Sequence, residues 1–175
     1  MIEYIKGEIT QLNPTDAVIE CNGIGYLLNI SLYTYSSLDG QKSAKLLVHE
    51  SIREDAHQLF GFINEQERQL FRQLIGVSGV GANTARVILS SIPAPDLETV
   101  IASGDDSRLK NVKGIGTKTA QRIIVDLRDK IKSVGNALIN QPNMGSDIYD
   151  EALAALVMLG FNKAQSQKAL KKIFA

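Results

Sequence analysis

The feature that most constrains the fold of this chain is an internal repeat. Residues 77–89 align without gaps with residues 112–124, and the two copies share glycines, small residues and apolar residues at equivalent positions. The identical pairs are Val77 and Val112, Gly79 and Gly114, Gly81 and Gly116, Thr84 and Thr119, Ala85 and Ala120, and Ile88 and Ile123. Chance is a poor explanation for this agreement, so the chain is expected to form the same turn twice.

Each copy predicts a helix-hairpin-helix motif, in which an apolar helix end is followed by a Gly-apolar-Gly turn and a second helix. The glycines let the backbone turn tightly and approach a ligand closely, while the apolar residue between them, Val80 or Ile115, tucks between the helices. The first amides of the second helix lack intrahelical partners and lie at the positive end of the helix dipole, which suits a phosphate. Because a backbone amide reads no base, such binding would not depend on base sequence.

The second copy carries charge that a purely structural turn does not need. A single Gly-x-Gly could serve only to let two helices pack, but Lys118 in the first turn of the second helix and Arg122 one turn later favour phosphate binding. Asn83 stands where Lys118 stands in the second copy, so the first copy should bind more weakly, through its amides and Arg86. The residues expected to contact DNA are Gly79, Val80, Gly81, Asn83, Arg86, Gly114, Ile115, Gly116, Thr117, Lys118 and Arg122.

The distribution of charge supports a local site over binding by overall charge. Nineteen basic residues balance nineteen acidic ones. Residues 1–63 hold four basic and eight acidic side chains, and residues 64–133 hold eleven and eight. Residues 108–132 contain eight basic and two acidic side chains, which gives a local net charge of +6. A basic stretch therefore adjoins an acidic domain, and any nucleic-acid binding must depend on local patches of charge and not on the total charge.

The first 63 residues predict a small β-barrel. Asn22-Gly23 is a hairpin-turn dipeptide, and the segment has five candidate strands and little helix. These strands are residues 2–11, 17–21, 26–30, 45–52 and 58–63. The leading architecture is the five-stranded OB-fold, and an SH3-like barrel is the alternative.

At Asn64 the apolar period changes from two to 3.6 residues, because Asn64 can cap a helix and Glu67 stands at the capping-box position. We expect helices to about Ser133, a flexible linker over residues 134–147, and a helical module over residues 148–175 in which Gly160 ends the first of two helices. The predicted fold class is therefore multidomain, β then α: a barrel, a double helix-hairpin-helix domain and a small helical module.

The sequence offers no catalytic or metal-binding constellation. Residues 114–119 lack the spacing of a nucleotide-binding P-loop, and His49, His57 and Cys21 lack metal-ligand spacing. We therefore expect no cofactor and no metal. With no signal peptide and no membrane-spanning run, a cytoplasmic location is expected. Two alternatives stay open: a helix-hairpin-helix DNA glycosylase or lyase, and an OB-fold single-strand DNA-binding protein.

Several motifs in one order resemble the RuvA family of Holliday-junction-binding proteins over essentially the whole chain. They are residues 52–56 (Ile-Arg-Glu-Asp-Ala), 59–62 (Leu-Phe-Gly-Phe), 66–68 (Gln-Glu-Arg), Leu70-Phe71, the two hairpins, and 154–161 (Ala-Ala-Leu-Val-Met-Leu-Gly-Phe). The resemblance implies an OB-fold, a double helix-hairpin-helix domain and a UBA-like third domain. The implied function is structure-selective, sequence-independent binding of four-way DNA junctions by a non-catalytic subunit, in recombination, repair and the SOS response.

The same resemblance implies roles that the residues alone do not. Glu54 and Asp55 would form an acidic pin near a four-fold axis, where carboxylates repel the strands that pass. A homotetramer or octamer would hold the junction, and the partners would be the hexameric RuvB ATPase and the RuvC resolvase. RuvB would dock on apolar residues of the third domain, which in this family usually has one more helix than the two seen here. Those residues are Leu156, Leu159, Phe161, Leu170 and Ile173.

Overall fold

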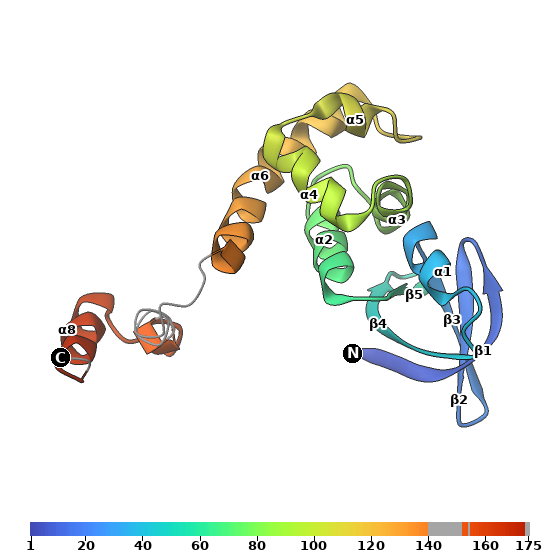
Figure 1. Cartoon of the computed structure of the whole chain (residues 1–175), viewed down its shortest axis with the longest axis horizontal. Helices are drawn as coiled ribbons and strands as arrows, with labels where there is room; N and C mark the ends of the chain where they lie inside the picture. Colours follow the sequence, from blue (N-terminus) through green and yellow to red (C-terminus); the bar gives the residue numbers. More distant parts are fainter. Residues whose placement is uncertain (140–151, 154, 174–175) are drawn as a thin grey trace. The chain divides into compact units, whose positions relative to one another are not determined.

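The computed structural model describes residues 1–139, 152–153 and 155–173 (Figure 1). The chain divides into two compact units, Met1–Ser133 and Val134–Ala175. Within the part of the chain so described, no helix is long and apolar enough to cross a membrane.

The N-terminal strands close into a barrel in the order β1-β2-β3-β5-β4. Strands β3 and β5 pair in parallel, and every other neighbouring pair is antiparallel. The strands are β1 (Tyr4–Asn13), β2 (Asp16–Cys21), β3 (Ile24–Ile30), β4 (Ser43–Ile52) and β5 (His57–Phe62). This closed five-stranded barrel confirms the OB-type architecture predicted from the sequence.

The hairpin between β2 and β3 forms as its turn dipeptide predicts. Asn22 and Gly23 have φ angles of 50° and 80°, the left-handed values that a two-residue hairpin turn needs. Cys21 and Ile24 pair directly on either side of the turn. The prediction succeeded because the turn is set by local backbone preference.

The structure also contains a helix in the barrel that the sequence analysis did not predict. α1 (Leu32–Leu38) follows β3, and its N-cap Ser31 accepts a hydrogen bond from the Thr34 amide. Tyr33, Thr34 and Tyr35 favour strands by propensity, which hid the helix. Ser31 is the signal that could have revealed it, because serine is a strong N-cap residue.

The second half of the first unit is helical. Its helices are α2 (Glu65–Ile75), α3 (Ala82–Ser91), α4 (Ala94–Ser103), α5 (Asp106–Lys110) and α6 (Thr117–Ile139). The Asn64 side chain accepts the Glu67 amide at 2.9 Å, which confirms the predicted N-cap of α2. Pro93 precedes α4, and Gly104, with a φ of 77°, ends it.

An apolar core joins the barrel to these helices. The Phe71 ring of α2 lies 5.1 Å from the Phe60 ring and 4.8 Å from the Phe62 ring, measured between centroids, and both partners belong to β5. All three side chains are at most 2% exposed. Burying a side chain of this size contributes about 1.5–3 kcal/mol, so α2 is held firmly against β5.

A buried polar cluster lies at the same junction. The Glu67 carboxylate accepts hydrogen bonds from the Ser31 hydroxyl, from the Thr34 hydroxyl at 2.7 Å and from the Ile63 amide at 3.3 Å. Burial raises the pKa of the Glu67 carboxyl above its ordinary value, and these hydrogen bonds act in the opposite direction. Glu67 is therefore satisfied by groups at the start of α1 and directly after β5, and it links them to α2.

The helix α6 continues to Ile139, whereas we expected helical structure to end near Ser133 and a linker to begin at residue 134. Gly135 suggested the break, but a single glycine costs a helix only about 1 kcal/mol, and the first proline beyond it is Pro142. That expectation was wrong for residues 134–139. The rest of the predicted linker, residues 140–147, lies outside the described residues.

In the second unit, residues 155–158 are helical and Gly160 ends the helix as predicted. Gly160 has a φ of 91°, its amide donates to the Val157 carbonyl at 3.0 Å, and the Phe161 amide donates to the Leu156 carbonyl at 3.1 Å. This is the pattern of a Schellman C-cap. The helix α8 (Lys163–Ile173) follows, and Leu153 and Leu170 are buried within the unit.

Candidate nucleic-acid interface

The two repeat copies form the same turn. In the first, the Val80 amide donates to the Val77 carbonyl at 3.0 Å, and in the second the Ile115 amide donates to the Val112 carbonyl at 3.0 Å. Gly79 and Gly114 have φ angles of 91° and 89°. Val80 and Ile115 are 5% and 6% exposed, so each tucks between its helices as expected.

A helix begins directly after each turn, with its first amides open. Gly81 caps α3 without any side-chain hydrogen bond. The first helical hydrogen bonds run from Ala85 to Gly81 and from Ala120 to Gly116, both at 2.9 Å, so the amides between them have no intrahelical acceptor. We call residues 81–84 the first amide site and residues 116–119 the second amide site.

The glycines at the start of the two amide sites are not required by the chain's own packing. Neither Gly81 nor Gly116 has a positive φ. A Cβ atom added at either position would meet no atom within 4 Å. Glycine there leaves the neighbouring amides open to close approach by a ligand.

The two repeat copies are joined by a hydrogen bond. The Arg122 guanidinium of α6 donates to the Ser78 carbonyl of the first turn at 3.2 Å. Arg122, Lys118 and Lys113 are exposed. The second amide site therefore has cationic side chains around it, and one of them, Arg122, contacts the first turn.

The first amide site has less positive charge around it than the second. Asn83 is exposed and neutral. Arg86, expected from the sequence to contact DNA, donates through one guanidinium nitrogen to the carbonyls of Thr15 and Ile30 in the barrel, at 3.2 and 3.3 Å. That nitrogen is therefore bonded to the barrel, and the contact of Arg86 with DNA stays a prediction.

Glu54 and Asp55 lie at the exposed tip of the loop between β4 and β5. The loop is closed by a hydrogen bond from the Arg53 amide to the Ala56 carbonyl at 2.8 Å. Across the described ranges of the chain, neither carboxylate forms a salt bridge. Both charges are thus fully presented to whatever approaches the loop.

The predicted docking residues of the second unit fall into separate classes. Leu159 and Phe161 are 75% and 59% exposed, Leu156 is half-buried, and Leu170 is buried. Ile173 belongs to α8, but its side chain lies outside the described residues. The sequence analysis missed Val157 and Met158, which are also exposed, because helical periodicity assigned them no face.

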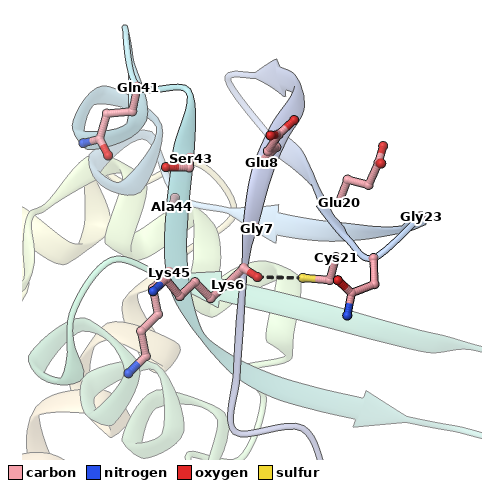
Figure 2. Close-up of a pocket in the computed structure, with 11 residues that line it drawn as sticks. Lys6, Gly7, Glu8, Glu20, Cys21, Gly23, Gln41, Ser43, Ala44 and Lys45 are labelled. Carbon is pink, nitrogen blue, oxygen red and sulfur yellow. Dashed lines mark hydrogen bonds between the residues drawn. The ribbon is translucent and has the colours of Figure 1, made fainter.

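A hollow of about 770 Å³ lies on the barrel, and its lining differs from that of a phosphate site (Figure 2). Lys6 and Lys45 line it together with Glu8 and Glu20, so its charges offset one another. The Cys21 thiol donates to the Lys6 carbonyl within it. In the residues that the structure describes, no group of three or more His, Cys, Asp or Glu side chains is placed to hold a metal ion.

A barrel followed by two helix-hairpin-helix turns and a helical unit defines a modular protein of the tandem hairpin class. Family models agree in the same order: residues 1–61 match the RuvA N-terminal domain, 71–129 the SAM-like helix-hairpin-helix tandem, and 147–174 the RuvA C-terminal domain. The chain belongs to the RuvA family.

Relatives named Holliday junction branch migration complex subunit RuvA align with nearly the whole chain. The one from Bacteroides fragilis is 55% identical over 181 residues, covering 99% of this chain and 90% of the relative. The one from Azobacteroides pseudotrichonymphae is 52% identical over 175 residues, covering 99% and 89%. The one from Flavobacterium psychrophilum is 44% identical over 178 residues, covering 100% and 91%.

The glycines of the turns should differ in what they contribute to stability. Gly79→Ala and Gly114→Ala should each lower the free energy of unfolding by about 1–2 kcal/mol, because alanine disfavours a positive φ. Gly81→Ala and Gly116→Ala should change it by less than about 0.5 kcal/mol, since the added Cβ meets nothing. Urea unfolding of the four variants measures both quantities. Equal losses at all four positions would contradict the assignment of Gly81 and Gly116 to ligand approach.

Proposed function

We propose that this chain binds four-way (Holliday) DNA junctions without base preference and serves as the DNA-binding subunit of a branch-migration complex. The observation that carries the proposal is the pair of amide sites, which have the same backbone geometry and belong to two repeat copies joined by the hydrogen bond from Arg122 to Ser78. The names of its relatives and its membership of the RuvA family support the same function.

Each amide site would bind one backbone phosphate. Its open amides and the positive end of the helix dipole attract the phosphate oxygens. At the second site, the Lys118 ammonium adds a charge-assisted contact. Because none of these groups reaches a base edge, recognition would follow the shape of the DNA and not its sequence. Two sites on one chain suit the two strands of a duplex arm.

The acidic loop would supply the selectivity for a junction. Carboxylates at Glu54 and Asp55 repel phosphates over roughly 8–10 Å at physiological salt. In a four-fold symmetric tetramer, or an octamer formed from two such tetramers, these loops would meet at the centre. A linear duplex crossing the centre would then be disfavoured, whereas the strands of a junction part there.

The second unit would recruit the motor. Its exposed apolar side chains, at Val157, Met158, Leu159 and Phe161, offer a surface for the hexameric RuvB ATPase. RuvC resolvase is a further proposed partner. The ATP-driven work would belong to RuvB, and this subunit would be non-catalytic. The cytoplasmic location expected from the sequence stays a prediction.

Junction binding is the central test. A four-way junction should be bound much more tightly than linear duplex of the same sequence in a competition gel, and the affinity should fall steeply with salt because several phosphate contacts release counterions. Lys118→Ala should weaken binding by about 1 kcal/mol per subunit. Gly116→Val should weaken it further by blocking the amides.

Lys130→Ala is the matched control, because Lys130 is an exposed lysine on the same helix, twelve positions from Lys118. It should bind as the unmodified protein does. Equal affinity for junction and duplex would refute the proposed function. Release of a base or nicking of damaged duplex would instead favour the glycosylase or lyase alternative.

Neutralising the acidic loop should reduce selectivity. In the double variant Glu54→Gln/Asp55→Asn, duplex binding should strengthen, by up to about fivefold if the change is worth about 1 kcal/mol, and the preference for junctions should fall. Fluorescence anisotropy with both DNAs measures the ratio. The control Glu20→Gln/Asp39→Asn removes two exposed carboxylates elsewhere on the barrel. An unaltered ratio in the loop variant would mean that the loop is an ordinary solvated turn.

Removing residues 140–175 should separate DNA binding from motor recruitment. The deletion keeps the whole of α6, so junction binding should persist while stimulation of RuvB-driven branch migration is lost. The point variant Leu159→Ser/Phe161→Ser should reproduce that loss, and Gln165→Ser, at an exposed polar position of α8, should not. Full motor activity without residues 140–175 would place the motor contact in the first unit.

A further inference from the structure

The first hairpin, made of α2 and α3, is fastened to one place on the barrel. That place is the corner at residues 30–34, where β3 ends and α1 begins, which we call the β3–α1 corner. Polar groups of α2 and α3 reach it from both sides. The side chains that do so are Glu67, Arg86 and Ser90.

Arg86 makes the most direct of these links. One nitrogen of its guanidinium donates to the carbonyl of Ile30 at 3.3 Å and to that of Thr15 at 3.2 Å. The Thr15 carbonyl also accepts the Ile30 amide at 3.0 Å. Arg86 thus binds the end of β3 and the β1–β2 turn at once, and it lies only two residues beyond the first amide site.

The charge of Arg86 affects the ionisation of Asp16 in the barrel. Hydrogen bonds from Asn13 and Thr15 lower the pKa of the Asp16 carboxyl, and the nearby Arg86 guanidinium lowers it further. Asp16 begins β2, beside the turn that Arg86 binds. On the barrel side, one nitrogen of the guanidinium is therefore matched by two carbonyl oxygens, with the Asp16 carboxylate nearby, while its buried Nε has no hydrogen-bond partner among the described residues.

Two more links converge on the corner. The Ser90 hydroxyl, one turn beyond Arg86 on α3, accepts the Leu32 amide at 3.1 Å. Glu67, in the first turn of α2, accepts the hydroxyls of Ser31 and Thr34. Both helices of the first hairpin are thereby bonded to the same five residues.

The second repeat copy is built differently. Gln121, which is exposed, stands where Arg86 stands in the first copy. The second copy is joined to the first through Arg122 and Ser78. The two copies thus share a turn geometry but contact different parts of the chain. In the first copy Arg86 binds the barrel, whereas in the second copy Lys118 is exposed.

We propose that Arg86 is a positioning residue that clamps the first hairpin to the β3–α1 corner and so fixes the amide sites relative to the acidic loop of the same barrel. The inference rests on the proposed function. Junction selectivity requires that phosphates held at the amide sites direct the strands toward Glu54 and Asp55. The clamp sets that geometry. The first copy uses its cation to hold the barrel, so phosphate attraction falls mainly to the second copy.

Arg86→Met tests the clamp, because methionine keeps an apolar stem and removes the donors. The ratio of junction to duplex affinity should fall about tenfold, roughly what one charged hydrogen bond is worth. Duplex affinity should change less than twofold, since the amide sites remain. Arg86→Lys should restore part of the ratio. If junction and duplex affinity fall together in Arg86→Met, Arg86 contacts phosphate and the proposal is wrong.

Ser90→Ala and Ser91→Ala form a matched pair that does not depend on the folding of the Arg86 variant. Ser90 bonds the corner, whereas the Ser91 hydroxyl donates only to the Val87 carbonyl within α3. Ser90→Ala should lower the affinity ratio and Ser91→Ala should not. Equal ratios in the two variants would overturn the proposal.

A measurement without DNA separates this inference from the proposed function. Spin labels at Lys42→Cys on the barrel and Ser107→Cys on α5, in a Cys21→Ala background and diluted with unlabelled chains, report the distance between barrel and hairpins. The distance distribution should broaden in Arg86→Met and stay narrow in Ser91→Ala. An unchanged distribution in Arg86→Met overturns the clamp, whereas an unmodified protein with no preference for junctions overturns the proposed function alone.

Discussion

The packing of Phe71 against Phe60 and Phe62 is the contact on which the rest of the first unit depends. It makes the last strand of the barrel part of the same core as the helices. A barrel and two hairpins joined only by a loop would place their surfaces independently. Because an aromatic core of this kind is closely packed and tolerates little change in volume, α2 has a defined position relative to the barrel, to which the polar links of α3 add.

The repeated turn divides its glycines between two tasks. Gly79 and Gly114 have a positive φ, so the turn itself requires them. Gly81 and Gly116 have neither a positive φ nor a close neighbour, so the chain's own packing does not require glycine there, and the proposed phosphate would use the space. The two kinds of glycine lie two positions apart, which is why the motif is recognised as one unit in the sequence.

Affinity and selectivity would come from different parts of this molecule. The amide sites would attract any phosphate and would not distinguish one DNA sequence from another. The acidic loop would act only by repulsion, so its effect would depend on where it lies relative to bound strands. Selectivity for shape is then a property of the geometry between the two, and the polar links at the β3–α1 corner keep that geometry constant.

The sequence alone determined what depends on neighbours along the chain: the repeated turn, the Asn22-Gly23 hairpin, the Asn64 cap and the helix end at Gly160. Each is decided within a few residues by backbone preference or by one local hydrogen bond. The tertiary structure decided what depends on distant partners. Residue propensities did not predict α1, whose N-cap Ser31 and whose Thr34 also donate hydrogen bonds to Glu67. The helix α6 continues past Gly135, the residue that suggested its end. The position of Arg86 just after the turn predicted a contact with DNA, and the structure adds hydrogen bonds from its side chain to Thr15 and Ile30. Those carbonyls lie more than fifty positions away along the chain, and only the folded barrel brings them within reach.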